Sequence, residues 1–143
     1  MLTFKMKTLQ ISQWRTRFKK INDLKLESFQ REYELKPGQA LLKHLASIIC
    51  QTDYQTATGT YYKSFPAPII PGYSFVAQVI DLAPPKTTYP PNCPQLAVGD
   101  MVAVMSAVGG LTTHSIIQVD DPKKSIVRIP TLIKTRRMNV LWI

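Results

Sequence analysis

The sequence predicts a mainly β domain that contains one or two short helices. Seven segments have the length and the apolar or alternating composition of strands, and turn residues separate them. Only one brief stretch carries both a helix start signal and a helix stop signal. The chain has 143 residues, of which 45% are hydrophobic and 19% charged. A domain of that size and composition buries a core of its own without disulfides or a metal.

Three strands are predicted before the helix. They are Lys7–Ser12, Leu24–Phe29 and Gln39–Ala46. The turn signal Lys36-Pro37-Gly38 precedes the third of them. In that strand His44 alternates with its apolar neighbours, which predicts a hydrogen-bonded histidine in the core or at an interface.

The helix is predicted over Thr52–Ala57. Thr52 is a residue type that caps helix N-termini, and Gly59 is able to end the helix with a positive φ. The following stretch is rich in proline, since eight of the eleven prolines lie between Pro66 and Pro94. Proline lacks a backbone donor and disfavours helix in the residue before it, so this stretch is predicted to be mostly loop.

One strand interrupts the proline-rich stretch, and three follow it. Phe75–Leu82 is apolar and β-branched, which predicts a largely buried strand. Ala83–Pro94 is predicted to be an exposed, extended loop. The last three strands are predicted at Met101–Met105, Thr113–Val119 and Ser125–Ile129, between turns such as Val98-Gly99-Asp100 and Gly109-Gly110.

The net charge of +9 is concentrated at the two ends of the chain. Residues 1–44 hold ten Lys or Arg and four Asp or Glu, a balance of +6, whereas residues 45–121 hold two against five, a balance of −3. No basic stripe interleaved with aromatic residues occurs, so nucleic-acid binding is not expected. The sequence also lacks a membrane span, a secretory leader and a Cys pattern for disulfides or zinc. These observations predict a cytoplasmic protein.

Several short motifs follow one another in a defined order. They are Pro37-Gly38 with the apolar run after it, Ala46–Asp53, Pro71-Gly72-Tyr73-Ser74, Val98-Gly99-Asp100 and Gly109-Gly110. In this order they resemble the medium-chain dehydrogenase/reductase superfamily. The resemblance implies that residues 1–130 form the family's GroES-like domain, a partly open β-barrel that shapes the substrate pocket. Residues 131–143 read as an atypical basic and apolar C-terminal tail, unlike the family's continuation.

The family's second half is a Rossmann domain that binds NAD(P)H. A dinucleotide fold needs a Gly-rich turn between a strand and a helix, and no such unit occurs in this sequence. We therefore expect the Rossmann domain to be absent and this chain alone to hold no cofactor. For a full-length family member the resemblance implies NADP(H).

The resemblance also supplies candidate site residues. Cys50 stands at a zinc-ligand position of the zinc-dependent members, and Thr52 stands at the position of their proton-relay hydroxyl. Tyr73 and Ser74 stand where those enzymes have His and Glu, so no zinc is expected. The sequence then resembles the zinc-free, quinone-oxidoreductase-like branch.

In that branch, the segment after Thr52 lines the substrate pocket. Asp53 is a further candidate at a family catalytic position, and Tyr54 and Tyr61 are candidates for the pocket wall. For each of the two tyrosines, packing with a solvated hydroxyl is the alternative role.

The sequence is compatible with two functions. The first is the substrate-side half of an NAD(P)H-dependent quinone or enone reductase, inactive as this isolated chain. The second is a non-catalytic GroES-like interaction domain that binds a protein partner. An uncovered barrel face that includes part of Ile48–Tyr54 predicts self-association or a partner, and Trp142 in the tail is suited to cover part of it.

Overall fold

The computed structural model describes residues 6–16, 23–62, 65–85, 93–106, 108–121 and 125–130. The tail 131–143 and residues 86–92 of the predicted loop lie outside the described residues, so the predictions made for them stay predictions. The described chain is mainly β, as predicted. Its elements are β1 (Lys7–Arg15), β2 (Lys25–Tyr33), β3 (Gln39–Ile48), α1 (Gln51–Thr58), β4 (Ser74–Leu82), β5 (Met101–Met105), β6 (His114–Gln118) and β7 (Ser125–Arg128).

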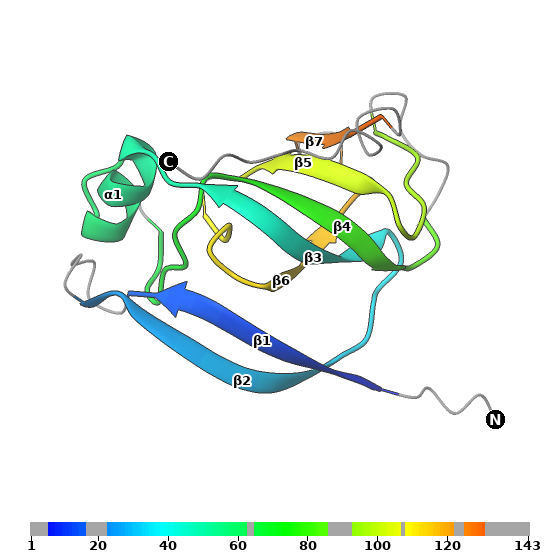
Figure 1. The fold of residues 1–143 in the computed structure, drawn as a ribbon, viewed down its shortest axis with the longest axis horizontal. Coiled ribbons are helices and arrows are strands. Elements are labelled where there is room, and N and C mark those ends of the chain that lie inside the picture. The colour runs from blue at the N-terminus through cyan, green and yellow to red at the C-terminus, as the bar shows by residue number, and fades with distance from the viewer. Residues whose placement is uncertain are drawn as a thin grey trace, which may run out of the picture.

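Strands β1 and β2 form an antiparallel ribbon that lies apart from the main sheet (Figure 1). Both strands are longer than the sequence predicts. The end of the ribbon at Arg15 is polar, and cross-strand side-chain pairs hold it: Arg15 pairs with Glu27 at 2.7 Å, and the hydroxyls of Ser12 and Ser28 are 2.8 Å apart. An apolar pattern does not reveal such pairs, which explains why the predicted first strand ends at Ser12 and β1 continues to Arg15.

The other five strands form one antiparallel sheet in the order β6-β3-β4-β5-β7. One face carries the main core, which includes Leu42, Phe75, Val79, Val102 and Ile126. Strand β4 buries every second residue from Phe75 to Val79, which confirms the predicted buried strand.

Backbone hydrogen bonds join the ribbon to the sheet side at the Arg15 end of β1, and Asp81 of β4 contacts Lys7 and Tyr33 at the other end. The Thr113 N–H donates to the Ser12 carbonyl at 2.8 Å, and the Trp14 N–H donates to the Leu111 carbonyl at 2.9 Å. Thr16 exchanges two backbone hydrogen bonds of 2.9 Å with Ile69. The two sheets therefore enclose a barrel-like space without closing into a continuous barrel, as the partly open barrel requires.

The single α-helix of the described residues begins at Gln51, one residue earlier than predicted. Its N-cap is Cys50, so the prediction that Thr52 caps it is wrong. Gly59 ends the helix with a φ of 75°, as predicted. In the part of the chain that the structure describes, no helix combines the length and hydropathy needed to cross a bilayer.

Candidate functional site

The candidate residues gather where β3 ends, α1 runs and β4 begins. Figure 1 shows this corner at one end of the sheet, with α1 standing beyond the strand ends. Cys50 begins α1, Thr52, Asp53 and Tyr54 lie within it, and Tyr73 directly precedes β4. The chain reversal between β3 and β4 thus brings residues about 20 positions apart into one region.

Asp53 is the structural centre of this corner. Only 4% of its surface is exposed, and each carboxylate oxygen accepts a backbone hydrogen bond of 2.8 Å. One bond comes from the N–H of Cys50 and completes the N-terminus of α1. The other comes from the N–H of Gly72 in the turn before β4. Both oxygens are engaged, so this carboxylate fixes the helix against the turn.

The turn that carries Tyr73 is packed directly against the Gly109-Gly110 segment. The Gly110 N–H donates to the Gly72 carbonyl at 2.9 Å, and a Cβ on Gly110 would lie 2.7 Å from that same oxygen. Gly72 itself has a φ of 112°. Glycine is therefore required on both sides of this contact.

Two further side chains hold the Gly110 carbonyl, and the sequence did not assign them this function. Ser47 donates to that oxygen at 2.6 Å, and the Nδ1 of His44 lies 3.1 Å from it. The Nε2 of His44 lies 2.8 Å from the Ser115 hydroxyl, and its ring stacks on Phe75 at 3.9 Å. Burial lowers the pKa of His44 to about 4, so the ring is neutral at pH 7.

His44 is therefore the hydrogen-bonded histidine that its strand position predicted. The sequence feature that could have indicated the contact between His44 and Gly110 is the Gly109-Gly110 pair, because adjacent glycines permit close approach of another segment. The sequence could not show which strand approaches that pair.

The aromatic side of the corner brings Tyr61 together with Tyr73 and Cys50. The Tyr61 ring lies 4.4 Å from that of Tyr62 and 6.4 Å from that of Phe65. A hydrogen bond with Tyr62, followed by desolvation and by the nearby Tyr73 and Cys50, raises the pKa of Tyr61 to about 12. A tyrosine of ordinary pKa is already protonated at pH 7, so the raised pKa makes Tyr61 a poorer base without changing its protonation state there.

The remaining candidates on α1 are partly or largely exposed to solvent. The Cys50 thiol is exposed, and Tyr54 is 50% exposed on the outer side of α1. Within the described residues the Tyr54 hydroxyl has no hydrogen-bond partner. Thr52 is half-buried. Tyr73 and Cys50 thus both influence the Tyr61 hydroxyl electrostatically, whereas Tyr54 is not among the groups that do.

The donor set of the corner does not fit a catalytic zinc ion. Such a site needs three protein ligands. Cys50 could be one of them, but Tyr73 stands where the second ligand, a histidine, would be required. Among the described residues, no group of three His, Cys, Asp or Glu is close enough to hold a metal. The described strands also pair only antiparallel, so these ranges do not supply the parallel strand–turn–helix unit of a dinucleotide site.

Exposed apolar side chains surround the corner. Ile48 and Ile49 are 66% and 73% exposed. Beside them, an apolar groove of about 290 Å³ runs over the ends of β3, β4, β5 and β7, with Met105 and Val127 in its lining. Isolated exposed apolar residues are ordinary, whereas larger contiguous apolar surfaces are typical of interaction sites in general.

Comparison with known proteins places the chain in a family. Residues 36–123 match the family model described as the alcohol dehydrogenase GroES-like domain. No curated protein sequence is significantly similar to the chain.

Several solved structures share its fold. A probable oxidoreductase from Mycobacterium abscessus is 18% identical with a TM-score of 0.67, and the match covers 85% of this chain and 35% of that chain. A putative NADPH:quinone reductase from Bacillus thuringiensis is 21% identical with a TM-score of 0.65, covering 85% and 34%. The quinone oxidoreductase from Thermus thermophilus, also determined in complex with NADPH, is 20% identical with a TM-score of 0.59, covering 83% and 32%. The chain spans about a third of the length of these structures.

Proposed function

Because the chain belongs to the alcohol dehydrogenase GroES-like domain family, we propose that it forms the substrate-side part of an NADP(H)-dependent oxidoreductase. The match over residues 36–123 is the observation that carries the proposal. Support comes from the shared fold of the Thermus thermophilus enzyme, a quinone oxidoreductase determined in complex with NADPH.

Quinones or enones are the proposed substrate class. Reduction of such a substrate develops negative charge on its carbonyl oxygen, and a positioned donor near that oxygen lowers the barrier. Tyr61 is the candidate donor, because its hydroxyl lies near Tyr73 and Cys50, and a substrate carbonyl would take the place of Tyr62 as its hydrogen-bond partner. NADP(H) supplies the hydride when it is bound.

The protein's own part is to position the substrate. Asp53 fixes α1 to the turn before Tyr73, and Ser47 and His44 fix the opposite side of that turn through Gly110. The described residues offer no cofactor site, so we expect this chain alone to transfer no hydride.

A chimera tests the proposal. Residues 1–130 would replace the corresponding domain of the Thermus thermophilus quinone oxidoreductase, and calorimetry would first verify that the chimera binds NADPH. We expect quinone-dependent NADPH oxidation, and a decrease of about tenfold or more in Tyr61→Phe. Trp14→Phe, on the ribbon, is the control and should keep the activity. A chimera that binds NADPH and reduces no quinone would contradict the proposal.

The exposed apolar surface favours a second candidate function, an interaction domain that binds a protein partner or a second copy. Light scattering over a concentration series would detect association of the chain alone. If the surface beside α1 is responsible, Ile49→Glu should abolish association. Val98→Glu is a matched control, since Val98 is 62% exposed outside the groove and the α1 corner. Association that neither variant changes would exclude this surface.

A further inference from the structure

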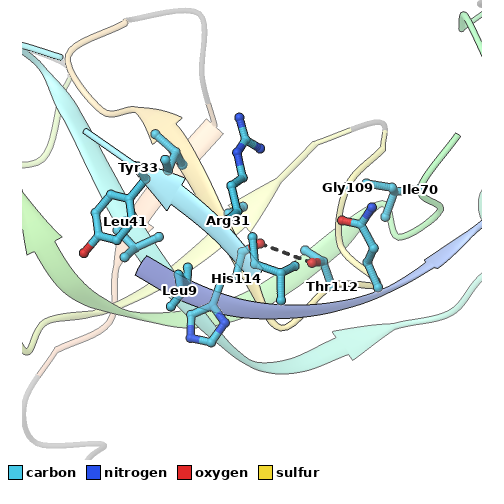
Figure 2. A pocket seen from close by; sticks show the side chains of 12 residues that line it. Leu9, Arg31, Tyr33, Leu41, Ile70, Gly109, Thr112 and His114 are labelled. Carbon is cyan, nitrogen blue, oxygen red and sulfur yellow. Dashed lines mark hydrogen bonds between the residues drawn. The ribbon is translucent and has the colours of Figure 1, made fainter. Parts of the chain in front are cut away.

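A second cavity lies between the β1–β2 ribbon and the main sheet, and Gly109 and Ile70, next to the corner, form part of its lining (Figure 2). Its volume is about 220 Å³. One wall comes from the ribbon and the other from β3, β6 and the segment before β6. None of the candidate residues around α1 lines it.

Arg31 places a positive charge at the rim of this cavity, on an exposed side chain. Arg31 lies directly opposite Leu9 in the ribbon, on the face that also carries Ile11. Alternation along a strand normally reserves such a face for apolar residues. Within the described ranges Arg31 has no ion-pair partner. The nearby carboxylate of Asp81 is already engaged, by Lys7 at 2.6 Å and by the Tyr33 hydroxyl at 3.2 Å.

Arg31 is also the only lining residue with a formal charge at neutral pH. The other titratable groups of the lining are Tyr33 and His114. Burial raises the pKa of Tyr33, and burial together with the nearby Lys43 lowers the pKa of His114. Both side chains are therefore neutral at pH 7, and the cavity is electrostatically suited to an anion.

Gln13 supplies a polar group at the other end of the ribbon wall. The residue is 8% exposed overall and lines the cavity, and the described part of the chain holds no hydrogen-bond partner for its side-chain amide. Among the described residues only Arg15 and Thr56 carry a fully buried polar side-chain atom without a partner, so the Gln13 amide is open to the cavity, where a ligand group can replace its water contacts. Gln13 lies four residues from Leu9, the partner of Arg31, so the two backbones are roughly 14 Å apart.

The rest of the lining limits the size and character of a ligand. Leu9, Ile11, Leu41 and Ile116 form an apolar middle between the two polar ends. A cavity of about 150 Å³ is known to hold benzene, so this one holds about nine or ten non-hydrogen atoms. The lining thus fits a small, flat or short-chain body with one anionic end and one polar end.

We propose that this cavity binds a small monocarboxylate that carries a hydrogen-bonding group at its far end, such as a hydroxy-aromatic acid. The carboxylate pairs with the Arg31 guanidinium, the apolar body lies against Leu9 and Ile116, and the far group bonds to the Gln13 amide. The site is separate from the proposed substrate pocket, so it stands or fails independently of the proposed function.

The test is an NMR titration of the full chain with 4-hydroxybenzoate. We expect saturable shifts of the backbone amides of Leu9, Thr112 and His114. The neutral analogue 4-hydroxybenzamide should bind about tenfold more weakly, because it cannot pair with the guanidinium. Absence of saturable shifts below about 10 mM, or shifts only around α1, would overturn the proposal.

Three variants assign the contacts. Arg31→Gln should weaken 4-hydroxybenzoate by about tenfold, whereas Lys25→Gln removes the same charge elsewhere on β2 and should change binding less than about twofold. Gln13→Leu should weaken 4-hydroxybenzoate about fivefold and leave benzoate unchanged. Arg31 is exposed and unpaired within the described residues, so its replacement should not impair folding.

An equal effect of Arg31→Gln and Lys25→Gln would overturn the proposal. A second result would also overturn it: the Arg31→Leu variant associates through its ribbon, and the unsubstituted chain binds no ligand. In that case Arg31 would serve only to protect an edge strand.

Discussion

Replacement of Asp53 removes the link between α1 and the turn that carries Tyr73. Its buried carboxylate accepts the Cys50 and Gly72 N–H groups, each at 2.8 Å. In Asp53→Ala both amides lose their acceptor, and the residue's 4% exposure leaves water little access to replace it. The helix start and the turn should therefore separate.

The expected cost follows from the two hydrogen bonds. A hydrogen bond to a charged group contributes about 1.5–3 kcal/mol, so the loss of both in Asp53→Ala should lower the free energy of unfolding by about 3–6 kcal/mol. Asp53→Asn keeps one carbonyl acceptor but turns an NH₂ donor toward the other amide, and should cost about 2 kcal/mol. Domains of this kind have a total stability of about 5–15 kcal/mol, so the loss is large.

Urea unfolding followed by circular dichroism would measure both variants. Glu32→Ala, an exposed acidic residue on β2, is the control and should change stability by about 0.5 kcal/mol or less. If Asp53→Ala does not fold, Asp53→Asn still gives a measurable midpoint. A loss below about 1 kcal/mol in Asp53→Ala would refute the role assigned to this carboxylate.

Three further predictions concern the surroundings of this corner. The folded pKa of His44, about 4, lies below its unfolded value of 6.5, so its contribution to stability is complete above pH 6.5 and is lost as the pH falls toward 4. Because His44 is partly exposed, we expect the free energy of unfolding to fall by about 2 kcal/mol between pH 6.5 and 4, and this fall should be absent in His44→Gln. Identical pH profiles of unfolding for the two proteins would contradict this. Gly110→Ala should lower the melting temperature by about 5 °C or more, because the new Cβ would lie 2.7 Å from the Gly72 oxygen; an unchanged value would show that the turn adapts. The Thr56 hydroxyl is buried without a hydrogen-bond partner in the described residues, so Thr56→Val should raise the free energy of unfolding by about 1 kcal/mol; a decrease would reveal a missed partner.

The strands were predictable because their signals are local. Phe75–Leu82 is β-branched and bounded by turn residues, and β4 occupies Ser74–Leu82. Gly59 was likewise predictable as the end of α1, since a left-handed residue after a helix is usually glycine.

The start of α1 could not be predicted from the sequence with the same accuracy. Thr52 is a better capping residue than Cys50 by type, yet Cys50 is the N-cap. The Asp53 carboxylate reaches back to the Cys50 N–H and forward to the Gly72 N–H, and the second bond spans 19 positions. A contact between distant segments determines this boundary, and no local pattern reports it.

The ribbon cavity was not predictable for the same reason. The second strand was predicted to end at Phe29, so Arg31 lay outside it, whereas β2 continues to Tyr33. Two bulges in β3, one of them between His44 and Ala46, also change which side chains share a face. The position of Arg31 against Leu41 and Ile116 therefore appears only once ribbon and sheet are placed together.

The central claim is that this chain forms the substrate side of a reductase and supplies no dinucleotide site. Calorimetric titration of the full chain with NADPH tests it most directly. We expect no saturable heat and a dissociation constant for NADPH above about 1 mM, which corresponds to a binding free energy weaker than roughly 4 kcal/mol. Saturable micromolar binding of NADPH to the chain alone would contradict the claim.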